Sequence, residues 1–341
     1  MQAFVLVKYG SPLREVTMAE PAARPHEVLV RMVAAGVNHA DERTRAGEFK
    51  AVLPLKLPKV MGGELSGEII AVGSDVSGFA VGDLVYAYTG VDAMGTFAQV
   101  VAVDAAALAR TPTTLSTVQA AALPVVALTA WQALTGIAQV GPGQTVLVHG
   151  GAGGVGAVAI QLAKHLGATV ATTVSGSSVD FARDRGADIV IDYRTEAFVE
   201  RLKDVPIDVV LDTQGGEVLT RSLEVLRVGG TIIGITGPPD PAFAEQVGAN
   251  IVVKQALRVI SARTRRRAKA HGVTYRFLFI EPDGAALRAI ARLVDDGVLR
   301  PHIDRVLAFA QTPQALAQLI AGGTNGKVLV TTDPDAVTHH D

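Results

Sequence analysis

The chain has 341 residues, 49% of them hydrophobic, which is enough for roughly two domains with sizeable cores. Its 31 Lys and Arg against 33 Asp and Glu give a net charge of −2, which excludes a strong overall attraction to nucleic acid or to an anionic membrane. There is no cysteine, which excludes disulfides, thiolate nucleophiles and cysteine-ligated zinc.

The first part of the chain, up to about residue 120, is rich in short apolar runs separated by glycine turns. The runs at residues 28–33, 65–72 and 84–88 are typical of short strands. They predict a β-rich, barrel-like domain over residues 1–124. The opening residues form such a run and lack the charged start of a signal peptide. No apolar run is long enough to cross a bilayer. We therefore expect a cytoplasmic protein without a membrane or nucleic-acid partner.

Residues 125–280 have a different pattern, in which strand-like and helical runs alternate. A helix is expected over residues 125–135. Strands are then expected at 145–149, 168–174, 189–193, 207–212, 231–236 and 274–280, and helices at 155–166, 179–185, 197–203, 219–226 and about 251–270. Six strands in such alternation predict an α/β fold with a doubly wound parallel sheet.

The last part of the chain returns to mixed, short elements. A helix over residues 283–295 precedes strands at 305–309 and 327–331, which flank a helix at 313–321. These are too few for a third domain, so we expect residues 281–332 to complete the N-terminal domain. Residues 333–341 are expected to be a disordered tail.

A glycine-rich stretch at residues 150–156 lies between the first of the parallel strands and the helix after it. Such a turn directs backbone N–H groups and the positive end of a helix dipole toward one point, which suits a pyrophosphate. Because the strand and helix are both in place, the stretch predicts a dinucleotide site.

The end of the second parallel strand indicates which dinucleotide binds. In NAD sites an acidic residue there holds the ribose hydroxyls, but here the strand runs into Ser175 and glycine, with no acid before Asp180. A 2′-phosphate has room, and Arg183, Arg185, Tyr193 and Arg194 could bind it. This favours NADPH over NADH. The alternative is that the serines only cap the next helix.

The eight histidines show no HExxH motif and no pair four residues apart. His39, next to Asn38 and before Asp41, is the strongest candidate ligand, but three or four convergent ligands cannot be assembled around it. No metal site is expected.

Several motifs in this order resemble those of the medium-chain dehydrogenase/reductase superfamily. They are Gly36–Val–Asn–His–Ala–Asp41, Met61–Gly–Gly–Glu–Leu–Ser–Gly67, Val81–Gly–Asp–Leu–Val85, Leu123–Pro–Val–Val–Ala–Leu–Thr–Ala–Trp131, the glycine turn, Gly186–Ala–Asp–Ile–Val–Ile–Asp–Tyr–Arg194 and Leu211–Asp–Thr–Gln–Gly–Gly216. Over about residues 1–332 the chain is most similar to the zinc-free quinone oxidoreductases related to zeta-crystallin. The resemblance implies a GroES-like catalytic domain, split in sequence, and a Rossmann NADP-binding domain.

The resemblance also implies which residues hold the cofactor. The pyrophosphate turn corresponds to Ala152, Gly153, Gly154, Val155 and Gly156, and the 2′-phosphate positions to Ser175 and Tyr193. The nicotinamide half corresponds to Thr129, Thr236, Phe277 and Phe279, and the segment that closes the cofactor cleft to Asn325 and Lys327. Many relatives have a lysine where Ser178 stands, and Arg183 or Arg194 would have to replace it. The zinc ligands of related alcohol dehydrogenases are replaced by Asn38 and Gly63.

The function expected from this resemblance is hydride transfer from NADPH to a quinone or an α,β-unsaturated carbonyl, without a metal. Asn38 and Asp41 are the expected catalytic residues, and Arg43, Arg45 and Tyr88 are further candidate donors to the acceptor oxygen. Two alternatives stay open: a zinc-free alcohol dehydrogenase, and a non-enzymatic NADPH-binding or RNA-binding protein that would use the basic run 263–269. Family analogy suggests a homodimer.

Overall fold

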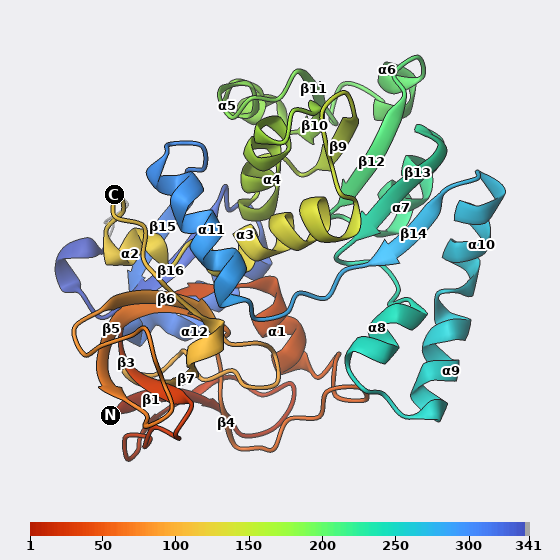
Figure 1. Ribbon diagram of the computed structural model, residues 1–341. Helices are drawn as coiled ribbons and strands as arrows, with labels where there is room; N and C mark the ends of the chain where they lie inside the picture. Colours follow the sequence, from red (N-terminus) through yellow and green to blue (C-terminus); the bar gives the residue numbers. More distant parts are fainter. Residues whose placement is uncertain (338–341) are drawn as a thin grey trace. The chain divides into compact units, whose positions relative to one another are not determined.

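A computed structural model describes residues 1–337 of the chain (Figure 1). The chain divides into two compact units. The central unit is Thr129–Phe279, and the split unit combines Met1–Leu128 with the described chain from Ile280 onward. The split unit therefore depends on two segments that are far apart in sequence.

The central unit is built on a six-stranded, wholly parallel sheet. Its strand order is β11-β10-β9-β12-β13-β14. This is the doubly wound order of a Rossmann fold, whose ligands bind where the order reverses, at the carboxyl ends of the strands. Here the reversal lies between β9 and β12. The strands are β9 (Thr145–His149), β10 (Thr169–Val174), β11 (Ile189–Asp192), β12 (Ile207–Asp212), β13 (Leu226–Gly234) and β14 (Thr274–Phe277).

Helices connect these strands as the alternating pattern predicts. They are α4 (Gly154–His165), α5 (Val179–Asp184), α6 (Phe198–Leu202), α7 (Gly216–Ser222), α8 (Pro241–Gln246), α9 (Ile251–Ile260) and α10 (Ala262–Ala270). Before them, α3 (Pro124–Trp131) runs into a π-helical turn at Gln132–Ile137, where an uninterrupted helix was predicted.

Two of the predicted helices were wrong in extent. The helix predicted at 219–226 spans Gly216–Ser222, and Leu226 already begins β13. Leu219, Leu223 and Leu226 are all buried, so their apolar spacing did not distinguish the end of a helix from the start of a buried strand. The helix predicted at 251–270 is two helices that meet at Ser261, whose hydroxyl bonds back to the Leu257 carbonyl at 2.8 Å. Such back-bonding bends helices.

The split unit contains a seven-stranded and a three-stranded sheet. The larger has the order β15-β16-β3-β5-β6-β8, with β7 also paired to β3, and the smaller has the order β2-β1-β4. The strands are β1 (Gln2–Leu6), β2 (Arg14–Thr17), β3 (Glu27–Val37), β4 (Lys59–Val60), β5 (Glu64–Val72), β6 (Leu84–Tyr88), β7 (Val100–Asp104), β8 (Leu108–Arg110), β15 (Ile303–Ala308) and β16 (Lys327–Thr331). Its helices of eight residues or more are α1 (His39–Ala46), α11 (Gly284–Asp295) and α12 (Thr312–Ala321), and α2 (Thr117–Ala120) is a single turn.

The C-terminal segment completes the sheet of the split unit. β16 pairs antiparallel with β3, and the ring of Phe309 packs edge-on against Phe4 with centroids 5.2 Å apart. Both phenylalanines belong to one buried core. The sheet and the core of the split unit are thus built from two segments that are far apart in the sequence.

Of the tail predicted to be disordered, Pro334–Ala336 form one 3-10 turn, and residues 338–341 lie outside the described residues. None of the described helices has the length and apolar character that a membrane span requires.

Candidate functional site

The glycine turn of the central unit follows β9 and leads directly into α4. Gly150 has a φ of +70°, and a Cβ on Gly156 would lie 2.2 Å from the Gly150 carbonyl oxygen. The turn therefore excludes side chains at these positions and allows a close backbone approach. Gly153 is the N-cap of α4 and makes no side-chain cap, and the first turn of the helix has no acid. The residues fit a pyrophosphate, which the N–H groups of Gly154, Val155 and Gly156 would bind.

Two strand ends form the adjoining part of the central unit. Ser175 follows β10, and its hydroxyl lies 3.2 Å from that of Ser177 and 3.4 Å from that of Ser178. Tyr193 follows β11, its N–H donates to the Val174 carbonyl at 3.1 Å, and its side chain is 58% exposed. Ser175 and Tyr193, predicted for the 2′-phosphate, therefore lie at neighbouring strand ends.

An acidic side chain that the sequence analysis missed lies at the same place. A Cβ on Gly176 would be 2.6 Å from an Asp192 carboxylate oxygen, so that carboxylate borders the serine turn. Asp192 is the last residue of β11, and its other oxygen accepts the Arg194 N–H at 3.0 Å. The acid of NAD sites is expected at the end of β10, whereas the parallel register here brings the end of β11 beside it.

The residues predicted for the nicotinamide half lie on three elements. Thr236 is exposed after β13, Thr129 is buried on α3, and Phe277 is buried at the end of β14. Phe243 of α8 packs edge-on against Phe277 and tilted against Phe279, with centroids 5.4 and 5.0 Å apart. Phe277 and Phe279 thus belong to one aromatic cluster with Phe243, which the sequence did not predict.

His149 ends β9 and is a structural residue. Its ring nitrogens lie 3.0 Å from the Thr173 hydroxyl and 2.8 Å from the Ser222 hydroxyl. Burial lowers the pKa of His149 to about 4, so the imidazole is neutral at physiological pH. With both nitrogens bonded, His149 ties three elements of the central unit together.

A buried polar cluster in the split unit contains the predicted catalytic residues. The sheet register assembles it: Val328 pairs with Val37, Gly36 pairs with Glu64, and Glu64 pairs with Tyr88. Lys327, Asn38, Glu64 and Tyr88 therefore come from four adjacent strands or their ends. A Cβ on Gly36 would lie 2.1 Å from a Glu64 carboxylate oxygen, so glycine at this position makes room for the acid.

Lys327 and Glu64 form an ion pair at the centre of this cluster. The ammonium also donates to Asn38 Oδ1 at 2.6 Å, and Asn38 Nδ2 donates to Glu64 Oε1 at 2.8 Å. Glu64 Oε2 accepts the backbone N–H of Val125 at 2.7 Å. These bonds fix the orientation of the Asn38 amide, whose side chain also hydrogen-bonds to the Asp41 carboxyl group.

Asp41 and Tyr88 adjoin the cluster. The Asp41 carboxylate accepts the backbone N–H of Asn38 at 2.8 Å at the start of α1, and burial raises its pKa to about 7. Burial, together with the nearby carboxyl groups of Asp41, Asp92 and Glu64, also raises the pKa of Tyr88, which stays protonated as an O–H donor. Burial and the nearby cations of Lys327 and Arg43 lower the pKa of His39, which favours its neutral form.

Three further candidates have partners of their own. Arg45 makes a bidentate pair with Glu42 at 2.6 and 2.7 Å, and Arg43 donates to Glu48 at 2.8 Å. Asn325 is exposed, and its N–H donates to Asp304 at 3.0 Å. The two arginines are thus engaged within the split unit, while Lys327, predicted with Asn325 for the cofactor, lies in the buried cluster.

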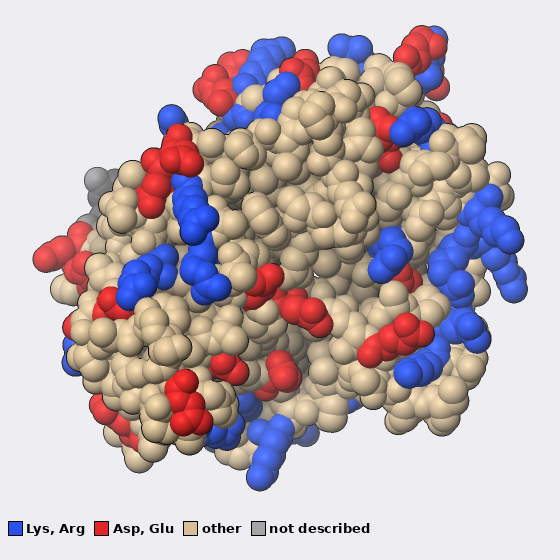
Figure 2. All heavy atoms as spheres, in the orientation of Figure 1, with Lys and Arg blue, Asp and Glu red and all other residues tan. Residues whose placement is uncertain are grey.

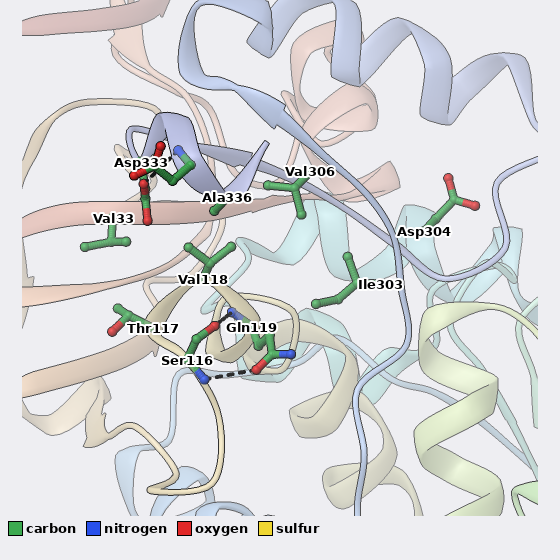
Figure 3. Close-up of a pocket in the computed structure, with 11 residues that line it drawn as sticks. Val33, Ser116, Thr117, Val118, Gln119, Ile303, Asp304, Val306, Asp333 and Ala336 are labelled. Atoms are coloured by element: carbon green, nitrogen blue, oxygen red, sulfur yellow. Dashed lines mark hydrogen bonds between the residues drawn. The ribbon is translucent and has the colours of Figure 1, made fainter. Parts of the chain in front are cut away.

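Metal ligands do not converge in the described part of the chain: no three His, Cys, Asp or Glu side chains are placed to hold an ion. A separate cavity of about 730 Å³ lies in the split unit (Figure 3). Its lining is apolar at Val33, Val118 and Val306 and acidic at Asp304 and Asp333. None of the predicted site residues lines it, and we assign it no part in the chemistry.

Both units of the chain are similar to known proteins. The model of the alcohol dehydrogenase GroES-like domain matches residues 24–113, and that of zinc-binding dehydrogenases matches residues 185–330. NAD(P)H oxidoreductase RTN4IP1, mitochondrial, from Danio rerio is 32% identical over 97% of this chain and 91% of its own length. The chloroplastic NADPH-dependent alkenal/one oxidoreductase of Arabidopsis thaliana is 30% identical over 97% of this chain and 79% of its own length.

A solved structure with the same architecture is the quinone oxidoreductase from Coxiella burnetii. It superimposes with a TM-score of 0.83 at 31% identity, covering 98% of this chain and 99% of that one. The similarity therefore extends over both units.

Proposed function

The chain belongs to the quinone oxidoreductase branch of the medium-chain dehydrogenase/reductase family, and on that premise we propose that it reduces quinones or α,β-unsaturated carbonyls without a metal. It is an NADP(H)-dependent oxidoreductase. NADPH supplies the hydride when it is bound. The residues of the chain must then orient the acceptor, exclude water and stabilise the negative charge that develops on its oxygen.

The observation that carries the metal-free proposal is the ion pair between Lys327 and Glu64. The ammonium of Lys327 neutralises the carboxylate of this buried cluster. A second cation there would be repelled by the ammonium. The positions of the zinc ligands in related alcohol dehydrogenases are taken here by the amide of Asn38 and the side-chain-free Gly63, neither of which is a preferred zinc ligand.

We assign charge stabilisation at the acceptor oxygen to two donors of the split unit. Asn38 Nδ2 donates to Glu64, and its second N–H would exchange its bond to Asp41 for one to the acceptor oxygen. The Tyr88 hydroxyl stays protonated because burial raises its pKa. Lys327 and Glu64 act as positioning residues, since their bonds hold the Asn38 amide in one orientation.

The experiment that tests the proposal is NADPH oxidation by the purified protein with quinones, alkenals and cyclic enones, before and after treatment with a strong chelator. Turnover of at least one acceptor class that survives chelation is expected. No turnover with any acceptor would overturn the assignment of substrate class, and a loss of activity after chelation would overturn the metal-free assignment.

The alternative of a zinc-free alcohol dehydrogenase makes a different prediction. It requires reduction of NADP⁺ by simple alcohols, and we expect none. A higher kcat/KM with any alcohol than with every enone and quinone would favour that alternative.

A further inference from the structure

A stretch of 35 residues, 246–280, contains no Asp or Glu but eight Lys or Arg. The rest of the chain has 33 acids and 23 bases, so the small net charge conceals an uneven distribution. Most of these cations lie on α9 and α10 of the central unit. Figure 2 shows Lys and Arg gathered over the part of the surface that these helices occupy in Figure 1.

Helix α9 has an apolar face that the other described residues hardly cover. At helical spacing this face contains Val252, Val253, Ala256, Leu257, Val259 and Ile260. Only Leu257 is buried, whereas Val252 and Val259 are each 74% exposed and Ile260 is 58% exposed. Exposing several neighbouring aliphatic side chains to water is unfavourable, and such patches mark surfaces that contact another molecule.

Helix α10 continues this surface with positive charge. Ala268 faces inward, and Arg263, Arg266 and Arg267 are exposed. None of these three arginines forms an ion pair with another described residue. Arg265 instead bonds back to the Ser261 hydroxyl and the Arg258 carbonyl, at 3.1 and 3.0 Å. Unpaired cations beside an open apolar face form what we call the α9–α10 surface.

We propose that the α9–α10 surface binds the face of a membrane that contains anionic phospholipid. Helices with an apolar face and many Lys or Arg lie in the plane of the bilayer interface, where aliphatic side chains enter the acyl boundary and cations bind the phosphates. Val252, Val259 and Ile260 supply the first contact, and Arg263, Arg266 and Arg267 supply the second.

Other partners fit these features less well. Nucleic acid would bind the cations but gives no reason for the exposed aliphatic side chains, and Tyr275 and Phe277, aromatic residues of the same stretch, are buried and unable to stack on bases. A two-fold dimer through this surface would bring two copies of the same cation-rich patch together, and residues 246–280 contain no acid to pair with these cations. A bilayer provides both apolar contact and negative charge.

The test is cosedimentation of the whole protein with vesicles of phosphatidylcholine alone and of phosphatidylcholine with phosphatidylglycerol. We expect binding only to the anionic vesicles, weakened as salt is raised. Replacing three cations, in Arg263→Gln/Arg266→Gln/Arg267→Gln, should weaken binding on the order of a hundredfold. Its control, Lys8→Gln/Arg14→Gln/Lys50→Gln, removes three exposed cations of the split unit and should bind as the wild type does.

A second pair of variants isolates the apolar contribution. Val252→Ser/Val259→Ser should lose most of its binding at unchanged charge, whereas Val81→Ser, at another exposed valine, should not. Circular dichroism and thermal unfolding must show that each variant is folded. The proposal is overturned by equal binding to neutral vesicles, by equal losses in the Lys8/Arg14/Lys50 variant, or by no binding at all. It is also overturned if the valine variant shows wild-type binding, or if it turns a wild-type dimer into a monomer in light scattering without vesicles.

Discussion

The ammonium group of Lys327 is paired with the carboxylate of Glu64, 263 residues earlier in the chain, and both side chains are buried. Lys327→Met would leave Glu64 as a buried charge without a counter-ion. We expect it to lower the free energy of unfolding by about 3–5 kcal/mol. Urea unfolding measures this loss. The double variant Lys327→Met/Glu64→Gln should lose less than the sum of the two single variants. Additive losses would contradict a direct interaction.

Tyr88→Phe tests the assignment of an oxygen-binding donor. We expect kcat to fall on the order of a hundredfold, as when one donor to a developing oxyanion is removed. Tyr86 provides a matched control, because it is also buried on β6 but its hydroxyl donates to the Leu287 carbonyl at 2.7 Å. Tyr86→Phe should lower stability by about 1 kcal/mol and leave kcat near the wild-type value. Steady-state kinetics compares the kcat values of the two variants. Equal decreases in kcat would contradict the role of Tyr88.

Asp41→Asn should change how stability depends on pH. The pKa of Asp41 rises from 3.8 to about 7 on folding, so the folded state binds its proton more tightly than the unfolded state does. The stability that this proton contributes is complete below the unfolded pKa. It is lost as pH rises to about 7, at a rate of about 1.4 kcal/mol per pH unit. The wild-type minus variant difference in unfolding free energy should therefore fall over this interval. A difference that is constant with pH would contradict the raised pKa.

Gly153→Asp should separate cofactor binding from stability. A Cβ at Gly153 would contact the Gly150 carbonyl only at 3.4 Å, and the N-cap position of α4 favours aspartate. The carboxylate would occupy the region where a pyrophosphate binds, so we expect a Tm equal to or above that of the wild type with NADPH affinity weakened tenfold or more, about 1.4 kcal/mol. Gly153→Asn has nearly the same shape without the charge. An equal loss of NADPH affinity in that variant would show that charge is not the cause.

Asp192→Asn should strengthen discrimination for NADPH. The carboxylate borders Gly176 beside Ser175, where a 2′-phosphate is expected, and removal of its charge should raise the ratio of NADH to NADPH dissociation constants. Asp184→Asn, at an exposed acid on α5, is the control. Fluorescence titration with both cofactors measures the ratio. An unchanged ratio in the Asp192 variant would place the 2′-phosphate elsewhere.

The sequence predicted the parallel sheet and the glycine turn because both depend on local patterns. Apolar runs alternate with helical spacing, and a glycine turn needs only its neighbouring strand and helix. The motif that contains Asn38 and Asp41 was recognised as well, but the sequence did not predict that it begins a helix, which α1 shows.

The partners of these residues could not be predicted in the same way. Glu64 stands within the motif at residues 61–67, yet nothing near it in the sequence indicates that a lysine of β16 neutralises it. That contact follows from the register of β16, β3 and β5. Asp192 was missed for the same reason, since the register of β10 and β11 brings it to Gly176. An acid at the start of a largely apolar strand, directly after Gly63, was the available signal for Glu64.

The position of β16 in the large sheet has a consequence for synthesis. The ribosome releases β3, β5 and the whole of Thr129–Phe279 before it makes Lys327. During that interval Glu64 has no cation and β3 has an open edge, whereas the parallel sheet of the central unit is already complete in sequence. The split unit is therefore the first to begin and the last to be completed. A chain stopped before β16 would retain an unpaired strand edge and a buried acid, and both features favour aggregation of a nascent protein.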